Sequence, residues 1–325
     1  MRIVSLIALT MTTALFAHDA SESNRWGVLG EWTMMRRAQL QGKSLANDSL
    51  KVLTDTTDNY TVLNSKQVES QFKYEPGYRV GAYAYISEET TLEFLALNCG
   101  EWAATKTIHG NETLSFSFND PTYTHDFNNA AEAIGHYKST FWSTEFNYWG
   151  HITPRDVDYF SLSWIAGARY MNISESFHLT YIQPGYKSHY TMTAHNHMPG
   201  PQLGIDLEIT PQGRLHWDIL AKGGILIDYC WQQTFLGDYN DTVILRNHKA
   251  FAISVPFFIE VEAALGYQLN THFNLHGGYD MLFVTGVALA PEQIDRDVDA
   301  DAGHKVYTGG KAIIHGWFLG LTLGF

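Results

Sequence analysis

Cysteine is nearly absent from the sequence. Only Cys99 and Cys230 occur among 325 residues. Two cysteines close at most one disulfide, so the small secreted domains that depend on several disulfides are excluded as a class. Both cysteines fall on the polar phase of their segments. We favour the interpretation that both are free thiols. A single disulfide between them is the open alternative.

Long apolar runs and basic residues are also scarce. Beyond residue 17 no run reaches the roughly 18 apolar residues that a membrane-spanning helix requires, which excludes a helical membrane protein. The 21 Lys and Arg residues face 34 Asp and Glu residues, for a net charge of -13. Binding to phosphates needs clustered Lys and Arg, so we expect no nucleic-acid partner. No Pro-, Gly- or Ser-rich linker divides the chain.

The N-terminus has the composition of an export signal. One basic residue, Arg2, precedes an apolar run over residues 3–16, with small residues at Ala14 and Ala17. This arrangement is typical of a secretory signal peptide. We predict a signal peptide over 1–17 and a single domain over 18–325, with an uncleaved membrane anchor as the alternative.

Apolar and polar residues alternate with a period of two through most of the chain. In 214–231 one face is aromatic at both ends and aliphatic between them, while the other face carries charges along its length. This is typical of a transmembrane strand, with aromatic girdles outside and a polar lumen inside. The same alternation occurs in 202–209, 251–268, 272–289 and the C-terminal HGWFLGLTLGF, residues 315–325.

A sheet made of such strands must be covered or closed. Open edges are hazardous in water and impossible in lipid, and helical periodicity is nearly absent, so few helices are expected to cover the sheet. We therefore predict an all-β fold, a transmembrane antiparallel up-and-down β-barrel. Lipid then covers the apolar C-terminal strand.

Connection lengths give a strand count. We expect short turns at 87–89, 172–176, 210–213 and 268–271 on the periplasmic side, and longer connections at 39–68, 191–199, 232–250 and 290–308 outside. Eleven strands are readable, the five segments above and those near 26–38, 77–86, 90–99, 139–149, 159–171 and 176–190. An even count requires one more, for which 111–118 is the best candidate. We predict about twelve strands, within a range of ten to fourteen.

Six segments from the middle to the end of the chain have features beyond periodicity. They are STEFNYW (143–149), AGARYMNISESF (166–177), PQLGIDLEI (201–209), GRLHWDILAKGGIL (213–226), GYDMLFVTGVALAPEQID (278–295) and HGWFLGLTLGF. These segments resemble the beta-barrel porin family of bacterial outer membranes, of the type abundant in planctomycetes. The resemblance is strongest over the C-terminal half, and ALAPEQI is its most specific part. It implies an outer-membrane barrel, and it does not establish transport.

The polar faces supply candidate pore-lining residues. They are Arg79, Glu93, Glu145, Arg169, Asp206, Glu208, Asp218, Lys222, Asp228, Glu260, Glu262 and Asp280, with Glu31, Arg37 and Arg214 on the same phase. Mixed charges suit a water-filled lumen, and an acidic excess favours cations. Pairing of these charges across a narrow, plugged lumen is the open alternative. The outward aromatic girdle is expected at Trp217, Tyr229, Trp231, Tyr267, Trp317 and Phe325.

Sites for metals and catalysis are weakly indicated. Four acidic residues alternate in one loop, Asp295, Asp297, Asp299 and Asp301, as a hard cation would require. The loop lacks the EF-hand glycine and glutamate, so a solvated acidic loop is the simpler interpretation. Three histidines, His189, His195 and His197, lack a second ligand cluster and are interpreted as loop histidines. No GxSxG motif or clear Ser–His pair occurs, so we expect no enzyme and no cofactor.

Two functional classes remain. The first is a porin-like channel for passive diffusion of small hydrophilic solutes or ions. The second is a structural or surface-interaction barrel with a plugged lumen. Either would be an integral outer-membrane protein in contact with lipid and lipopolysaccharide. Its terminal Phe325 is expected to present the last strand to the barrel assembly machinery.

Overall fold

The computed structural model describes residues 26–39, 42–48, 61–87, 89–116, 118, 127–153, 159–210, 214–238, 240–297 and 302–325. The predicted signal peptide over 1–17 lies outside these residues. In the described part of the chain, no helix is both long enough and apolar enough to cross a membrane.

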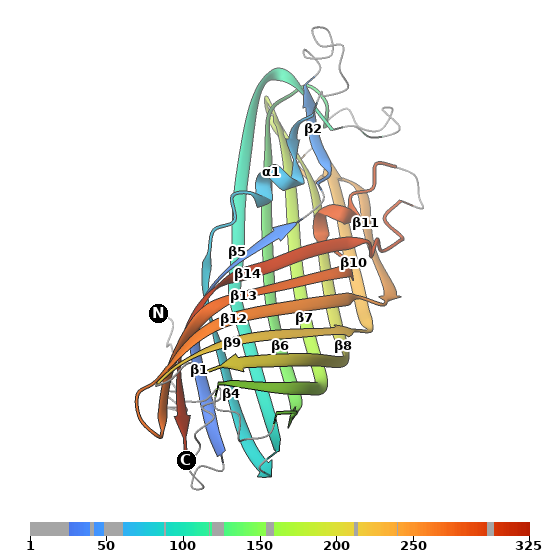
Figure 1. Ribbon diagram of the computed structural model, residues 1–325. Coiled ribbons are helices and arrows are strands. Elements are labelled where there is room, and N and C mark those ends of the chain that lie inside the picture. The colour runs from blue at the N-terminus through green and yellow to red at the C-terminus, as the bar shows by residue number, and fades with distance from the viewer. Residues whose placement is uncertain are drawn as a thin grey trace, which may run out of the picture.

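Long antiparallel strands make up most of the molecule (Figure 1). They are β1 (Trp26–Gln39), β4 (Glu75–Ser87), β5 (Thr90–Ser115), β6 (Ala130–His151), β7 (Phe160–Gln183), β8 (Tyr186–Ile209), β9 (Leu215–Ile225), β10 (Asp228–Asp238), β11 (Val243–Ser254), β12 (Phe257–Gln268), β13 (Phe273–Val287) and β14 (Gly310–Gly324). Shorter elements occupy the connections. They are β2 (Ser44–Asp48), β3 (Thr61–Asn64), α1 (Ser65–Glu69) and the 3₁₀ turn η4 (Ala290–Gln293).

Ten strands close into a ring. The order is β8, β7, β6, β5, β4, β1, β14, β13, β12 and β9, and β9 pairs back onto β8. Two strands of the ring continue beyond short interruptions. β10 follows β9 after residues 226–227, and β11 lies before residues 255–256, which lead into β12. β10 pairs with β8 and with β11, so these two strands extend the wall beside β8. Pro256 has no N–H to give to the ladder at this interruption, and its carbonyl accepts the Leu226 N–H at 2.9 Å. The predicted antiparallel barrel is confirmed.

The first and last described residues, Trp26 and Phe325, meet at one end of the ring, which we call the terminal end. The backbones of Trp26 and Phe325 exchange hydrogen bonds of 3.3 and 2.9 Å, and their rings stack with centroids 4.4 Å apart. At the opposite, distal end, β5 to β8 extend far beyond β1, β4, β9 and β12 to β14 (Figure 1), and β10 and β11 continue the sheet beside β8. β5 alone has 26 residues. About 9–11 residues suffice to cross a bilayer, so part of this distal wall must stand outside the lipid.

Polarity on the two faces of the wall inverts between the terminal and distal halves, and β7 shows this most directly. Its inward side chains are the odd-numbered ones along the whole strand. In the terminal half Trp164 is exposed on the outside and Arg169 is buried inside. In the distal half Phe177 and Tyr181 are buried inside, while His178 is exposed outside. The terminal half is therefore built for lipid, and the distal half for water.

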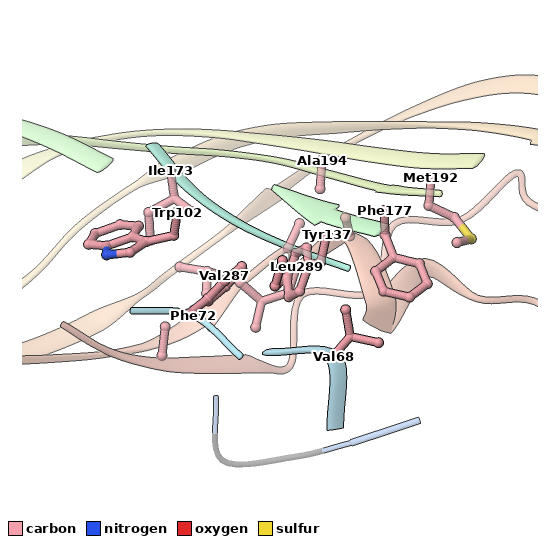
Figure 2. Packing of buried hydrophobic residues seen from close by; sticks show 14 of the residues in the cluster. Val68, Phe72, Trp102, Tyr137, Ile173, Phe177, Met192, Ala194, Val287 and Leu289 are labelled. Carbon is pink, nitrogen blue, oxygen red and sulfur yellow. The ribbon is translucent and has the colours of Figure 1, made fainter. Parts of the chain in front are cut away.

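A hydrophobic cluster, which we call the distal core, fills the distal half. The strands supply buried Trp102, Tyr137, Ile173, Phe177, Tyr181 and Met192, and the connections supply Leu45, Leu63, Val68, Phe72, Phe116, Phe127 and Leu289. Figure 2 shows side chains from both sources packed together. Each large apolar side chain that is fully buried stabilises the fold by about 1.5–3 kcal/mol. The connections are therefore held inside the barrel mouth.

Some predicted boundaries are wrong. Residues 172–176 and 191–199 lie within β7 and β8, where a turn and a loop are expected, and 232–250 narrows to a connection of 239–242. Residues 111–115 extend β5 and form no separate strand. The ring of ten strands is thus at the lower end of the predicted range. The error at 172–176 has a physical cause, because inversion of the apolar face looks like a break in the alternation.

The predicted aromatic girdle residues are mostly exposed. Trp217, Tyr229, Tyr267, Trp317 and Phe325 expose between 43% and 61% of their surface. Trp217 lies on β9 across from Leu265 of β12, close to Tyr267 and the terminal end. Tyr229 lies beyond the interruption at 226–227, toward the distal end. Their contact with the two membrane interfaces stays a prediction.

The outer surface gives a depth-dependent prediction. Outward apolar residues run from Phe251 to Tyr267 across β11 and β12, with Ile259 at the midpoint. We expect Ile259→Arg to lower the free energy of unfolding in lipid by about 2–4 kcal/mol, and Tyr267→Arg by about 0–1 kcal/mol. Urea unfolding of the refolded protein in lipid vesicles, followed by tryptophan fluorescence, measures both. Equal costs at the two positions would contradict a membrane centred on Ile259.

Candidate functional site

The candidate site is the charged inner face of the terminal half. Eleven of the twelve predicted pore-lining residues are at most 6% exposed, namely Arg79, Glu93, Glu145, Arg169, Asp206, Glu208, Lys222, Asp228, Glu260, Glu262 and Asp280. The twelfth, Asp218, has a side chain 23% exposed. Glu31 and Arg37 are buried too, whereas Arg214 is exposed and donates to the Leu269 carbonyl at 3.2 Å. Whether these residues line an open pore stays a prediction.

One group of charges centres on Arg79. Strand register puts Arg79 of β4 opposite Glu31 of β1, and Glu262 of β12 opposite Asp280 of β13. The Arg79 guanidinium reaches across the ring to Glu262 at 2.6 Å and Asp280 at 2.5 Å, and lies 3.2 Å from Glu31. Strands far apart in the ring are thus joined through its interior.

A second group is built in the same way. Glu145 of β6 is opposite Arg169 of β7, and Lys222 of β9 is opposite Glu260 of β12. Lys222 Nζ lies 2.9 Å from Glu145 and 3.4 Å from Glu260, and Arg169 pairs with Glu260 and, at 3.3 Å, with Glu145. We call the eight residues of these two groups the cross-lumen lattice.

Two amides extend the lattice, and the sequence did not mark either as functional. Gln202 Nε2 donates to Glu145 at 2.8 Å and to Asn147 Oδ1 at 2.6 Å. Asn147 Nδ2 in turn donates to Glu93 at 2.9 Å. In the sequence, these two amides are marked only by their position on the polar face of a strand, which many other residues share.

Three predicted residues lie outside the lattice, toward the terminal end. Asp206 and Glu208 are two residues apart on β8, and Asp218 of β9 is directly opposite Glu208. Asp228 lies elsewhere, at the start of β10, where it accepts the His197 N–H at 3.0 Å. Asp228 therefore links β10 to β8 through a hydrogen bond.

A separate ion cluster closes the distal core. Arg37 of β1 pairs with Glu69 of α1 at 2.7 Å and with Glu175 of β7 at 2.5 Å. Glu175 also accepts the Tyr137 hydroxyl at 2.8 Å and the Ala290 N–H of η4 at 2.9 Å. The cluster fastens both the α1 and the η4 connections to the barrel wall. The sequence missed Glu175 because it lay in a predicted turn.

Glu69, the carboxylate that α1 contributes to this cluster, has a pKa near neutral. Burial raises the pKa of Glu69 to about 7, Glu175 adds to the rise, and Arg37 offsets part of it. One guanidinium shared by two buried carboxylates leaves an excess of negative charge. A proton on Glu69 removes that excess.

The weaker candidates have other roles. Asp295 accepts the N–H groups of Asp297 at 3.0 Å and Gly303 at 2.9 Å, and so orders its loop. Asp299 and Asp301 lie outside the described residues. In the part of the chain that the structure describes, no three His, Cys, Asp or Glu side chains are grouped so that they could hold a metal.

The three histidines lie in β8, so their expected place in a loop is wrong. His189 Nδ1 is 3.0 Å from Asp241, His195 stacks on Trp231 with centroids 3.9 Å apart, and His197 is 2.6 Å from the Tyr170 hydroxyl. Separately, Cys99 and Cys230 are both free and buried, which confirms two unpaired thiols.

Comparisons with known proteins find only distant structural matches. No family profile matches the chain, so membership of the beta-barrel porin family is not shown, and no curated protein matches it. The outer membrane protease OmpT from Escherichia coli is 9% identical, with 95% of this chain and 100% of that chain covered and a TM-score of 0.47. The translocator domain of the autotransporter NalP from Neisseria meningitidis is 10% identical, with 94% and 90% covered and a TM-score of 0.39. A FadL homologue from Pseudomonas aeruginosa is 9% identical, with 92% and 89% covered and a TM-score of 0.26.

All three TM-scores are below 0.5, so the closed antiparallel ring of this chain rests on its own strand pairings. The likeness is too distant to transfer activity. It decides neither for nor against an enzyme, and the expected absence of catalysis stays a prediction.

Removing one cation of the cross-lumen lattice should destabilise the folded protein. Arg169→Met leaves Glu145 and Glu260 to share Lys222, and we expect the free energy of unfolding to fall by about 3–5 kcal/mol. Adding Glu260→Gln should restore part of the loss. The control is Lys138→Met, which removes an ion pair with Glu101 whose side chains are 43% and 50% exposed and should cost at most about 1 kcal/mol. Urea unfolding in detergent measures each, and equal costs for both single variants would contradict the role of the lattice.

Glu69 predicts a pH dependence with a definite sign. Its pKa is about 7 in the folded protein against an ordinary value of 4.5, so the folded state binds the proton more tightly. This contribution to stability is complete below about pH 4.5 and is lost as the pH rises through about 7. In unfolding measured from pH 4 to 8, Glu69→Gln should abolish that part of the decline. Parallel curves for the two proteins would contradict it.

Proposed function

We propose that this outer-membrane barrel has a closed lumen and a structural or surface-interaction role. The cross-lumen lattice is the observation that carries the proposal. Its ion pairs join opposite sides of a ten-stranded ring, and its charged groups are nearly inaccessible to water. A diffusion channel needs a continuous water-filled path. Rings of about eight strands have interiors that side chains can fill, and ten is only slightly wider.

The distal core supports the same proposal. Beyond the lattice, apolar side chains of the connections pack against the strands, and the Arg37 cluster fastens α1 and η4 in place. A solute crossing the barrel would have to displace both layers. Opening the lattice would expose buried charges, and opening the distal core would expose apolar area.

The outer wall of the distal half is the surface available to partners. Most of its outward positions on β6 to β8 are polar, including Lys138, Ser176, His178 and Thr191. Hydroxyl, imidazole and ammonium groups of this kind suit the sugars and phosphates of lipopolysaccharide. At the other end, Phe325 completes the strand proposed to engage the assembly machinery. No catalytic step is part of this proposal.

Planar-bilayer conductance tests the closed lumen. The refolded protein should give no discrete current steps, while flotation of the same preparation with liposomes verifies insertion. Discrete steps with a cation-shifted reversal potential would overturn the proposal and establish the competing one, a porin-like channel for small hydrophilic solutes or ions.

A further inference from the structure

A pocket lies on the inner face of the ring near the terminal end. It is formed by β8, β9, β12 and β13, and its lining includes Asp206, His216, Asp218, Leu220, Glu262 and Ala264. Its enclosed cavity is small, about 20 Å³, and the wider hollow of about 370 Å³ around the cavity includes open solvent. The cross-lumen lattice adjoins it through Glu262, which binds Arg79.

The interior around this pocket has too few cations for its carboxylates. The described inner face of the terminal half has three Lys or Arg side chains, Arg79, Arg169 and Lys222, all engaged in the lattice. Two imidazoles also line the pocket, His216 and His276, and His276 Nε2 lies 3.1 Å from Glu31. The same inner face has nine carboxylates, Glu31, Glu93, Glu145, Asp206, Glu208, Asp218, Glu260, Glu262 and Asp280. Buried charges are stable only when they are paired. Protons or bound cations must therefore balance the remainder.

Asp206 is the side chain in greatest need of a partner. It is 6% exposed, faces the pocket, and makes no hydrogen bond or ion pair with the described residues. Asp218 has only the His216 ring, 3.7 Å away. Glu208, beside both, accepts a hydrogen bond from the Thr210 hydroxyl at 3.2 Å. The unpartnered carboxylate and the cavity in front of it together indicate a missing cationic ligand.

The walls favour an organic cation over a coordinated metal. No set of three metal-ligating side chains is grouped here or elsewhere in the described residues. Leu220 and Ala264 supply an apolar wall beside the carboxylates. The His216 ring lies over Gly266, where a Cβ would come within 2.0 Å of its Nε2 atom, so this glycine makes room for the ring. Carboxylates beside apolar carbon match an ammonium group on a short alkyl chain.

We infer that this pocket binds a small primary alkylammonium ion. Its ammonium group donates hydrogen bonds to the Asp206 and Asp218 carboxylates, and its carbons contact Leu220 and Ala264. Charge-assisted hydrogen bonds supply most of the affinity. The site does not depend on conduction, and an open or a closed lumen leaves it in place.

Calorimetric titration of the refolded full-length protein in zwitterionic detergent tests this inference. The probe is n-butylammonium chloride at low ionic strength, with sodium chloride as the ionic control. We expect one saturable site that sodium does not fill at the same concentration. Asp206→Asn with Asp218→Asn should weaken binding by about tenfold or more, the loss expected for two charge-assisted hydrogen bonds.

Two further variants separate the pocket from general acidity. Glu93→Gln removes another buried carboxylate that does not line the pocket, and its affinity should stay within about twofold of the parent. Ala264→Leu fills the cavity and keeps every carboxylate, so it should abolish binding even if the double variant fails to fold. Unsaturable binding, competition by sodium at equal concentration, or full affinity in Ala264→Leu would each overturn the inference.

Discussion

Closure of the backbone hydrogen-bond ladder is the constraint on which everything else depends. In lipid every N–H and C=O must find a partner within the protein. Here the first and last strands meet along a seam that begins with Gly27 opposite Gly324. The seam closes the ten-stranded ring and brings Trp26 next to Phe325. Once the ring is closed, each residue of a strand has only two directions available, inward or outward.

The environment on each side of the wall then decides which residues suit each direction. Within the membrane the outside is apolar and the inside collects charge. Beyond the membrane the outside is water, so the apolar residues turn inward and the connections can pack among them. The distal half thus resembles a soluble domain, with a core that contains Val68 and Leu289 from two separate connections. One continuous strand, such as β7, belongs to both halves.

Buried ion pairs fix how the strands of the terminal half are placed relative to one another. Strand register sets Glu145 beside Arg169 and Lys222 beside Glu260, and the narrow ring brings these two pairs into contact. Such a lattice costs desolvation and gains stability only if each charge keeps its partners. The arrangement therefore fixes the relative position of strands that do not touch through their backbones. The carboxylates that the lattice leaves without a cation make the pocket near the terminal end acidic.

The sequence by itself determined the all-β class, the closed barrel, and the inward phase of most charged residues. These follow from a local period of two that lipid and lumen impose on every strand. Only the tertiary structure decided that 159–171 and 176–183 form one strand, because the apolar face inverts where the strand leaves the membrane. It alone decided that Arg79 meets Glu262 and that Arg37 meets Glu69. Those contacts depend on ring size and register, and no local pattern records the distance across a ring.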